Sequence, residues 1–213
     1  MPALPIQKDA LLIQDDVSRW PGLRIEDLSS QGAKTFLQTF DISTMIPGLI
    51  DAVFKILIPE AIEDSIPPIC SIKLVLEDFD GIAFVYIAGT TRPETRESQI
   101  IGVFMHEMVH LWQWNGQGKA SRGLIEGVAD WVRLKAGFAV PHWRKRTDGA
   151  WDMGYDGTAY FLDGLELYYG KGFVVRLNRK LREEYVEGTF WEELCGVGNG
   201  VDVLWREYGK TLD

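Results

Sequence analysis

The sequence HEMVH at residues 106–110 places two imidazole side chains four residues apart. On an α-helix this spacing corresponds to about one turn of rise and about 40° of rotation, so both rings can reach one metal ion. Glu107 lies about 100° further round the same helix, where its carboxylate can serve as a base beside the metal. Two histidines and an adjacent glutamate in this pattern are typical of catalytic zinc sites.

A catalytic zinc ion also needs a third protein ligand, which leaves one position for water. Zinc peptidases that place glycine three residues and histidine six residues after the second histidine are excluded, because Gln113 and Gly116 occupy those positions. Sixteen residues past His110, the sequence EGVAD carries Glu126 and Asp130 on one face of a predicted helix. We predict that His106, His110 and Glu126 bind Zn²⁺, and that Asp130 accepts the spare ring N–H of one histidine.

Gly123 and Gly127 flank the acidic face of this second helix, and we expect their missing side chains to let the two metal-site helices approach closely. The alternative is a chance HExxH motif, with Glu126 and Asp130 forming a solvated acidic stripe. The apolar residues that surround the acidic pair, together with the motif upstream, favour metal binding.

Helical periodicity predicts the elements that position these residues, over 99–115 for the motif and over 122–136 for the acidic pair. The apolar back face of the first helix is expected to lie in the core. Further helices are predicted over 158–169, 172–185, 189–195 and 200–210, and Trp151, Trp191 and Trp205 are expected to form the core of this C-terminal half.

Before the motif, residues 32–62 predict one or two helices broken at Pro47 and Pro59. The alternating run 69–77 and the apolar run 82–88, separated by Asp80-Gly81, predict a β-hairpin. The expected fold is a single α+β domain over residues 1–213, with a small N-terminal sheet and a helical C-terminal half.

Composition narrows the functional classes further. The chain has 46% apolar residues and a formal net charge of −9, which is typical of a folded globular protein and argues against nucleic acid or an anionic membrane as a partner. No secretory signal is visible, so a cytoplasmic location is favoured. Cys70 and Cys195 are expected to be core residues, with one long-range disulfide between them as the alternative. We expect a monomer.

The stretch HEMVHLWQWNGQGKASRGLIEGVADWVRLKAGFAVPHW resembles the plant basic secretory protein family, which comprises peptidases of plants, fungi and bacteria. The resemblance continues through WDMGYDGTAYFLDGLE to VDVLWREYGKTL and spans roughly residues 70–210. It implies a zincin-like fold of the glutamate-ligand type and peptidase activity on proteins or peptides, carried by His106, Glu107, His110 and Glu126.

Two departures from the family pattern matter. Family members named for secretion begin with a signal peptide, so secretion is the alternative to the cytoplasm. The segment between the Asp-Gly turn and the metal helix is shorter than is general in the family, with 24 residues between Gly81 and His106. A shortened segment 82–98 could remove part of the strand that pairs with substrate, which raises the alternative of a catalytically silent, zinc-stabilised binding protein.

The expected reaction is hydrolysis of a peptide bond by a zinc-activated water, with Glu107 as the general base. Retention of Glu107 favours the enzyme over the silent binder, because a purely structural site needs no base. A second donor usually helps hold the oxyanion, and the candidates are His142 and Tyr155, with Tyr160 behind them. A loop histidine bonded to backbone and a half-buried packing tyrosine are the alternatives for these two.

Overall fold

The computed structural model describes residues 10–13, 22–26, 31–59, 69, 71–76 and 93–212. Its fold is α+β, as predicted, with eight helices and one three-stranded sheet among these residues. The chain divides into two compact units, of which the first comprises residues 1–51 and 68–96 and the second residues 52–67 and 97–213. The two units are described separately below.

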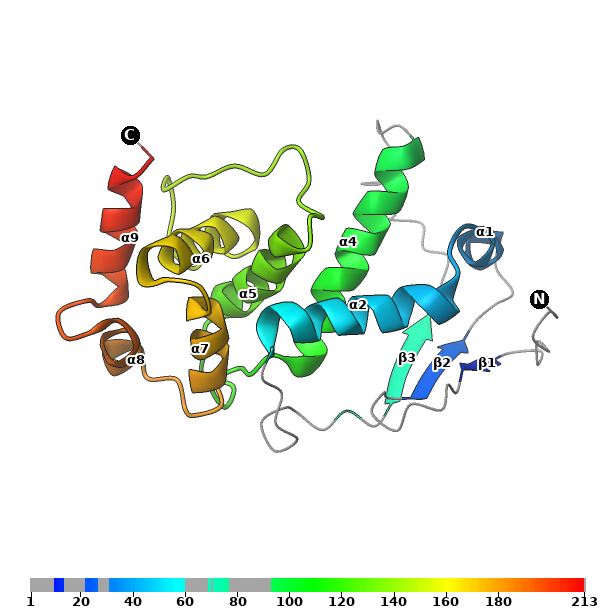
Figure 1. The fold of residues 1–213 in the computed structure, drawn as a ribbon, viewed down its shortest axis with the longest axis horizontal. Helices are drawn as coiled ribbons and strands as arrows, with labels where there is room; N and C mark the ends of the chain where they lie inside the picture. The colour runs from blue at the N-terminus through cyan, green and yellow to red at the C-terminus, as the bar shows by residue number, and fades with distance from the viewer. Residues whose placement is uncertain are drawn as a thin grey trace. The chain divides into compact units, whose positions relative to one another are not determined.

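The first unit contains the sheet, in the order β1 (Ala10–Ile13), β2 (Gly22–Glu26), β3 (Ser71–Val75) (Figure 1). Strands β1 and β2 are antiparallel, whereas β2 and β3 are parallel. Leu23 and Ile25 of β2 are buried in alternation with exposed neighbours, as expected for a sheet with one covered face. The strand predicted at 69–77 is confirmed as β3, and its predicted hairpin partner at 82–88 lies outside the described residues.

Two helices follow the sheet strand β2, namely α1 (Gln31–Thr39) and α2 (Ile42–Leu57). Asp41 separates them because its carboxylate accepts hydrogen bonds from the backbone N–H of Ser43 and the hydroxyl of Thr44, which caps the start of α2. Pro47 lies inside α2, so the predicted break at Pro47 is wrong. The break between the two helices lies earlier, at Asp41, and α2 tolerates the loss of the one backbone hydrogen bond that Pro47 cannot donate.

The second unit holds the helices of the C-terminal half and residues 97–112 of α4 (Pro93–Trp112). The others are α5 (Arg122–Lys135), α6 (Tyr155–Tyr169), α7 (Phe173–Lys180), α8 (Glu187–Cys195) and α9 (Val201–Lys210). Each helix predicted here is confirmed, except that α7 ends five residues earlier than expected. Its continuation is diverted because Leu181 and Tyr185 exchange backbone hydrogen bonds with Gly116.

Aromatic side chains fill the core of this unit. Trp151 and Trp191 are buried as predicted and meet edge to face at 5.3 Å, and Phe161 contacts both rings. Trp205 is only half-buried, and its indole N–H donates to the carbonyl of Gly149. Cys195 is a free thiol and half-buried, and Cys70 lies outside the described residues.

Helices α5 and α6 lie side by side (Figure 1). A side chain on Gly123 would meet the carbonyl oxygen of Asp152, and one on Gly127 would meet Thr158. These glycines therefore allow the close approach of α6 and the segment before it. The expectation that they bring the two metal-site helices together is wrong, because the face they occupy is turned toward α6.

Within the described part of the chain, no helix has both the length and the apolar composition that crossing a bilayer requires.

Candidate metal centre

Helix α4 carries the two histidines on one side and a packed apolar surface on the other. Met105, Met108 and Trp112 are buried, and the Trp112 ring contacts Phe54 at 5.4 Å. Val103, which shares the face of the histidines, is 43% exposed. The helix is thus anchored by its back face, as predicted from periodicity, while the opposite face opens to solvent beside the site.

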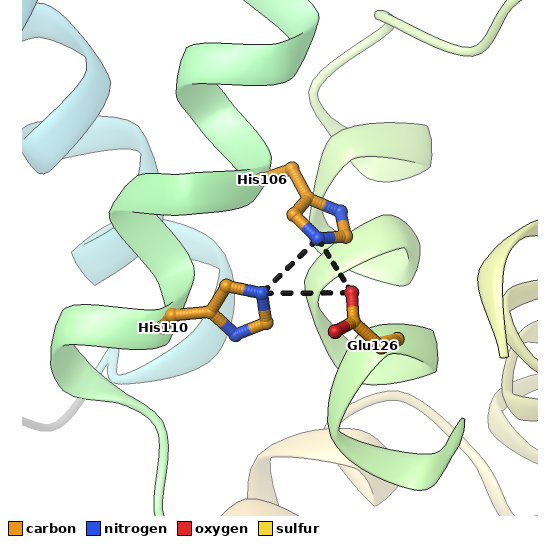
Figure 2. Close-up of side chains that lie close together, drawn as sticks. All are labelled: His106, His110 and Glu126. Carbon is orange, nitrogen blue, oxygen red and sulfur yellow. Dashed lines mark hydrogen bonds and ion pairs between the residues drawn. The ribbon is translucent and has the colours of Figure 1, made fainter. Parts of the chain in front are cut away.

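Helix α5 supplies the carboxylate. It begins after Ser121, whose hydroxyl accepts the backbone N–H of Leu124, and this cap fixes where the first turn starts. Glu126 lies in the second turn and its side chain is 17% exposed. Figure 2 shows His106 and His110 from α4 and Glu126 from α5 directed at one another.

The three candidate ligand atoms form a small triangle. The Nε2 atoms of His106 and His110 are 3.1 Å apart, and Glu126 Oε2 lies 3.0 and 3.7 Å from them, respectively. Two ligands each about 2.0 Å from a tetrahedral zinc ion are about 3.3 Å apart, so these separations bracket the value that such an ion requires. Two neutral imidazoles and one carboxylate are also a donor set that zinc prefers.

A buried carboxylate orients His106. The Nδ1 atom of His106 lies 2.7 Å from Oδ1 of Asp130, a residue that is 2% exposed. Because a carboxylate only accepts, the ring proton belongs on Nδ1, which leaves Nε2 to face the site. Burial lowers the pKa of His106, but the hydrogen bond to Asp130 and the charges of Asp130 and Glu107 outweigh it and raise the pKa overall.

His110 has a different environment. Gln113 Nε2 lies 3.1 Å from His110 Nδ1 and 3.1 Å from the carbonyl oxygen of Ile125, which links the histidine to the backbone just before Glu126. Burial and the nearby charge of His106 both lower the pKa of His110, so its ring favours the neutral form that a metal ligand needs.

The predicted base and the two candidate oxyanion donors differ in how they relate to this cluster. Glu107 is exposed on α4, and its negative charge favours a higher pKa for both His106 and His110. Tyr155 is the first residue of α6 and is 55% exposed, and Gly154 before it lies against Glu126, since a Cβ there would be 3.6 Å from the Glu126 Cβ. His142 is exposed in the segment between α5 and α6, and no hydrogen bond or ion pair of the described residues joins it to the metal ligands.

Tyr160, named behind these candidates, is half-buried on α6. Lys145 lies 5.9 Å from its ring centroid, and burial together with the charges of Asp156 and Asp163 raises its pKa. None of these three groups is one of the proposed ligands.

Sequence reasoning missed two residues that support the site, Gln113 and Arg133. Gln113 was used only to exclude one class of zinc peptidase, although it is three residues after His110 and directly follows α4. Arg133 is three residues after Asp130, and its Nη1 lies 3.8 Å from Asp130 Oδ1. The i, i+3 spacing was a usable signal in both cases, because residues so spaced are neighbours on a helix.

Comparison with protein families agrees with this geometry. The family model described as "Peptidase of plants and bacteria" (BSP) matches residues 22–208, and the chain belongs to this family. The match begins well upstream of residue 70, where the resemblance judged from motifs began. No curated protein and no solved structure shows significant similarity to the chain.

Proposed function

We propose that this protein is a zinc-dependent metallopeptidase, with His106, His110 and Glu126 as the metal ligands and Glu107 as the general base. The observation that carries the proposal is the triangle of two imidazole nitrogens and one carboxylate oxygen with edges of 3.0 to 3.7 Å. It lies in a chain that belongs to a family of peptidases. A protein or peptide is accordingly the proposed substrate.

The chemistry divides between the metal and the residues around it. When bound, a zinc ion supplies a Lewis acid that polarises the scissile carbonyl and makes water acidic enough to attack near neutral pH. Glu107 takes the proton of the attacking water and returns it to the leaving amine. Its exposed position suits this role, because the base must meet a substrate that arrives from solvent.

Tyr155 is the better of the two candidates for a second oxyanion donor. It is exposed and directly follows Gly154, which packs against the Glu126 side chain. His142 is exposed on the segment between α5 and α6, and in the described part of the chain no hydrogen bond or ion pair joins it to the proposed ligands. A phenol hydroxyl beside the metal would donate to the oxygen on which negative charge develops.

The first experiment measures metal content. Protein purified without a metal-affinity tag is expected to hold about one zinc per chain by elemental analysis, because three protein ligands are sufficient for a catalytic site. His106→Ala, His110→Ala and Glu126→Ala should each remove it. Full zinc retention in Glu126→Ala would reject Glu126 as a ligand.

The second experiment separates an enzyme from a zinc-binding protein without turnover. Glu107→Gln keeps size and polarity but cannot take a proton, so zinc and fold should be retained while cleavage of an unfolded protein substrate falls by about 10²- to 10⁴-fold. Glu97→Gln, an exposed glutamate on the same helix, is the matched control and should cleave like the wild type.

Cleavage by the wild type must also stop when a chelator removes the metal. A zinc-loaded wild type that cleaves no member of a broad peptide library would favour the silent binding protein. Equal activity in the wild type and Glu107→Gln would mean that the assigned base is wrong.

A further inference from the structure

Arg133 lies behind the metal centre, one contact further from the ligands than Asp130. It is 9% exposed, and its Nη1 is 3.8 Å from Asp130 Oδ1, the same oxygen that receives the N–H of His106. The three side chains therefore form a continuous series from guanidinium to carboxylate to imidazole. The last of them presents Nε2 to the ligand triangle.

The guanidinium group is held by contacts from three segments of the chain. Its Nε donates to the carbonyl oxygen of Phe138 at 3.0 Å, and its carbon lies 5.1 Å from the ring centroid of Trp143. On the α4 side, Gly102 leaves room for it, since a Cβ on Gly102 would be 2.7 Å from Arg133 Nε. A side chain fixed in this way has few alternative positions.

The charge of Arg133 is the one that Asp130 needs. Asp130 is almost fully buried, and a buried carboxylate is costly unless a cation or hydrogen bonds compensate it. Among the lysine and arginine side chains that the structure describes, that of Arg133 lies within ion-pair distance of Asp130. Lys135 pairs with Asp163 instead, and Arg122 pairs with Glu126 from an exposed position.

We propose that Arg133 is a positioning residue of the metal centre: it holds the Asp130 carboxylate and, through it, the orientation of the His106 ring. The inference rests on the proposed function, because it assigns His106 to a metal. Arg133 also joins residues 138–143 to the centre, since Phe138 and Trp143 both contact its guanidinium. His142 lies within that segment.

The test compares three variants of the whole protein. Arg133→Met keeps most of the side-chain volume and removes the charge, whereas Arg133→Lys keeps the charge and loses the planar group that bonds Phe138. Arg176→Met is the matched control, because Arg176 also lies over an aromatic ring, that of Phe173 at 5.8 Å, but is exposed.

Two readouts are needed, and the first uses metal-free protein. The His106 Nδ1 proton, buried in a 2.7 Å hydrogen bond to a carboxylate, should give a downfield, slowly exchanging NMR signal. In Arg133→Met this signal should shift and exchange faster. In Arg133→Lys it should be closer to the wild type, and in Arg176→Met it should be unchanged.

The second readout is zinc affinity, measured by competition with a chromophoric chelator. Removing a residue that orients a metal ligand typically lowers affinity about 10- to 100-fold, and we expect about 10-fold for Arg133→Met because Arg133 acts through Asp130. Arg133→Lys should recover part of this loss. An Arg133→Met protein with the zinc affinity and proton signal of the control would overturn the proposal.

Gly102→Ala gives an independent test that leaves Arg133 in place. Alanine favours the helix more than glycine, so α4 should not be weakened, yet the added methyl group must displace the guanidinium. We expect a several-fold loss of zinc affinity in a protein that still folds, as circular dichroism would show. An unchanged affinity and an unchanged proton signal would contradict the proposal, even if Arg133→Met proves too unstable to study.

These outcomes are separate from the fate of the peptidase proposal. A wild type that binds zinc but cleaves nothing would reject the enzyme and leave the affinity comparison valid. A wild type that takes no zinc would reject the metal site, and the metal-free proton signal would still decide whether Arg133 positions Asp130 and His106.

Discussion

Tyr155 has a backbone conformation that tyrosine rarely adopts. Its φ angle is 51°, in the left-handed region that favours glycine, and its side chain is 55% exposed. An aromatic residue held in this conformation typically costs about 1 to 3 kcal/mol, and such strain concentrates at functional sites. Its position one residue after Gly154, which packs on Glu126, suits a residue retained for its side chain rather than for stability.

Tyr155→Phe tests the hydroxyl group. If the phenol donates to the oxyanion, kcat should fall by about 10²-fold with little change in KM, because the contact forms mainly in the transition state. The measurement is steady-state cleavage of a peptide, with Tyr168→Phe, 81% exposed, as the control. If His142→Ala loses activity while Tyr155→Phe keeps it, the donor is His142.

Tyr155→Gly tests the strain. Glycine adopts a positive φ freely, so we expect the free energy of unfolding to rise by about 1 kcal/mol. Urea unfolding measures this as a higher midpoint concentration, and peptidase activity should be lost. A destabilised Tyr155→Gly would show that the tyrosine side chain stabilises the fold by more than its backbone costs.

At the scale of residues, i, i+4 spacing paired His106 with His110 and Glu126 with Asp130, and the need of a catalytic zinc for a third ligand joined Glu126 to the histidines. Spacing was not sufficient for the contacts that Arg133 makes beyond its own helix or for the surroundings of Tyr155. Their neighbours come from other segments, such as Gly102 and Trp143, and such contacts exist only after the chain folds.

The packing of α5 on α6 depends on glycines that leave no room for a side chain. In Gly123→Ala, a Cβ in the present position would be 1.6 Å from the carbonyl oxygen of Asp152, which is backbone and cannot turn aside. We expect a loss of about 1 to 3 kcal/mol in the free energy of unfolding, despite the better helix propensity of alanine.

Gly48→Ala in α2 is the matched control, because it has open space around the new methyl group. It should stabilise the protein by about 0.5 to 1 kcal/mol, as alanine does in an open helix position. Urea unfolding followed by circular dichroism measures both. A Gly123→Ala protein as stable as Gly48→Ala would show that the segment around Asp152 moves freely away.

At the scale of elements, the helices of the second unit could be predicted because their apolar positions repeat with the helical period. The parallel pairing of β2 with β3 could not, since it joins residues 22–26 to 71–75 and local periodicity says nothing about partners that far apart. The predicted break at Pro47 was wrong because the carboxylate of Asp41 caps the start of α2. The helix then continues through Pro47 at the loss of one backbone hydrogen bond.

For the whole molecule, buried tyrosines determine how the fold responds to alkali. Burial, followed by nearby acidic groups, raises the pKa of Tyr208 to about 12, and burial raises that of Tyr185 to about 12. In the unfolded chain these pKa values return to about 10. The stability linked to the neutral phenols is therefore complete below about pH 10 and is lost as pH rises toward 12.

We expect the midpoint of guanidinium unfolding to fall steeply between about pH 10 and 12 and the absorbance of phenolate to rise with it. Tyr208→Phe should make this fall shallower at little cost near pH 8, because the Tyr208 hydroxyl has no hydrogen-bond partner among the described residues. Tyr168→Phe, which alters an exposed ring, should leave the profile unchanged. Identical profiles for Tyr208→Phe and the wild type would show that ionisation of Tyr208 does not cause the loss of stability in alkali.

The ligand triangle and Asp130 all come from residues 106–130, which are adjacent in the chain, whereas the aromatic core draws on residues as far apart as Trp151 and Trp205. Contacts between near neighbours form faster during folding, since a loop of about ten residues closes in about 10 to 100 ns. If the proposed zinc ion binds at His106, His110 and Glu126, α4 and α5 would be able to capture it before the later helices arrive. Zinc present from the start of refolding should then shorten the search for the native state, rather than only occupy a finished site.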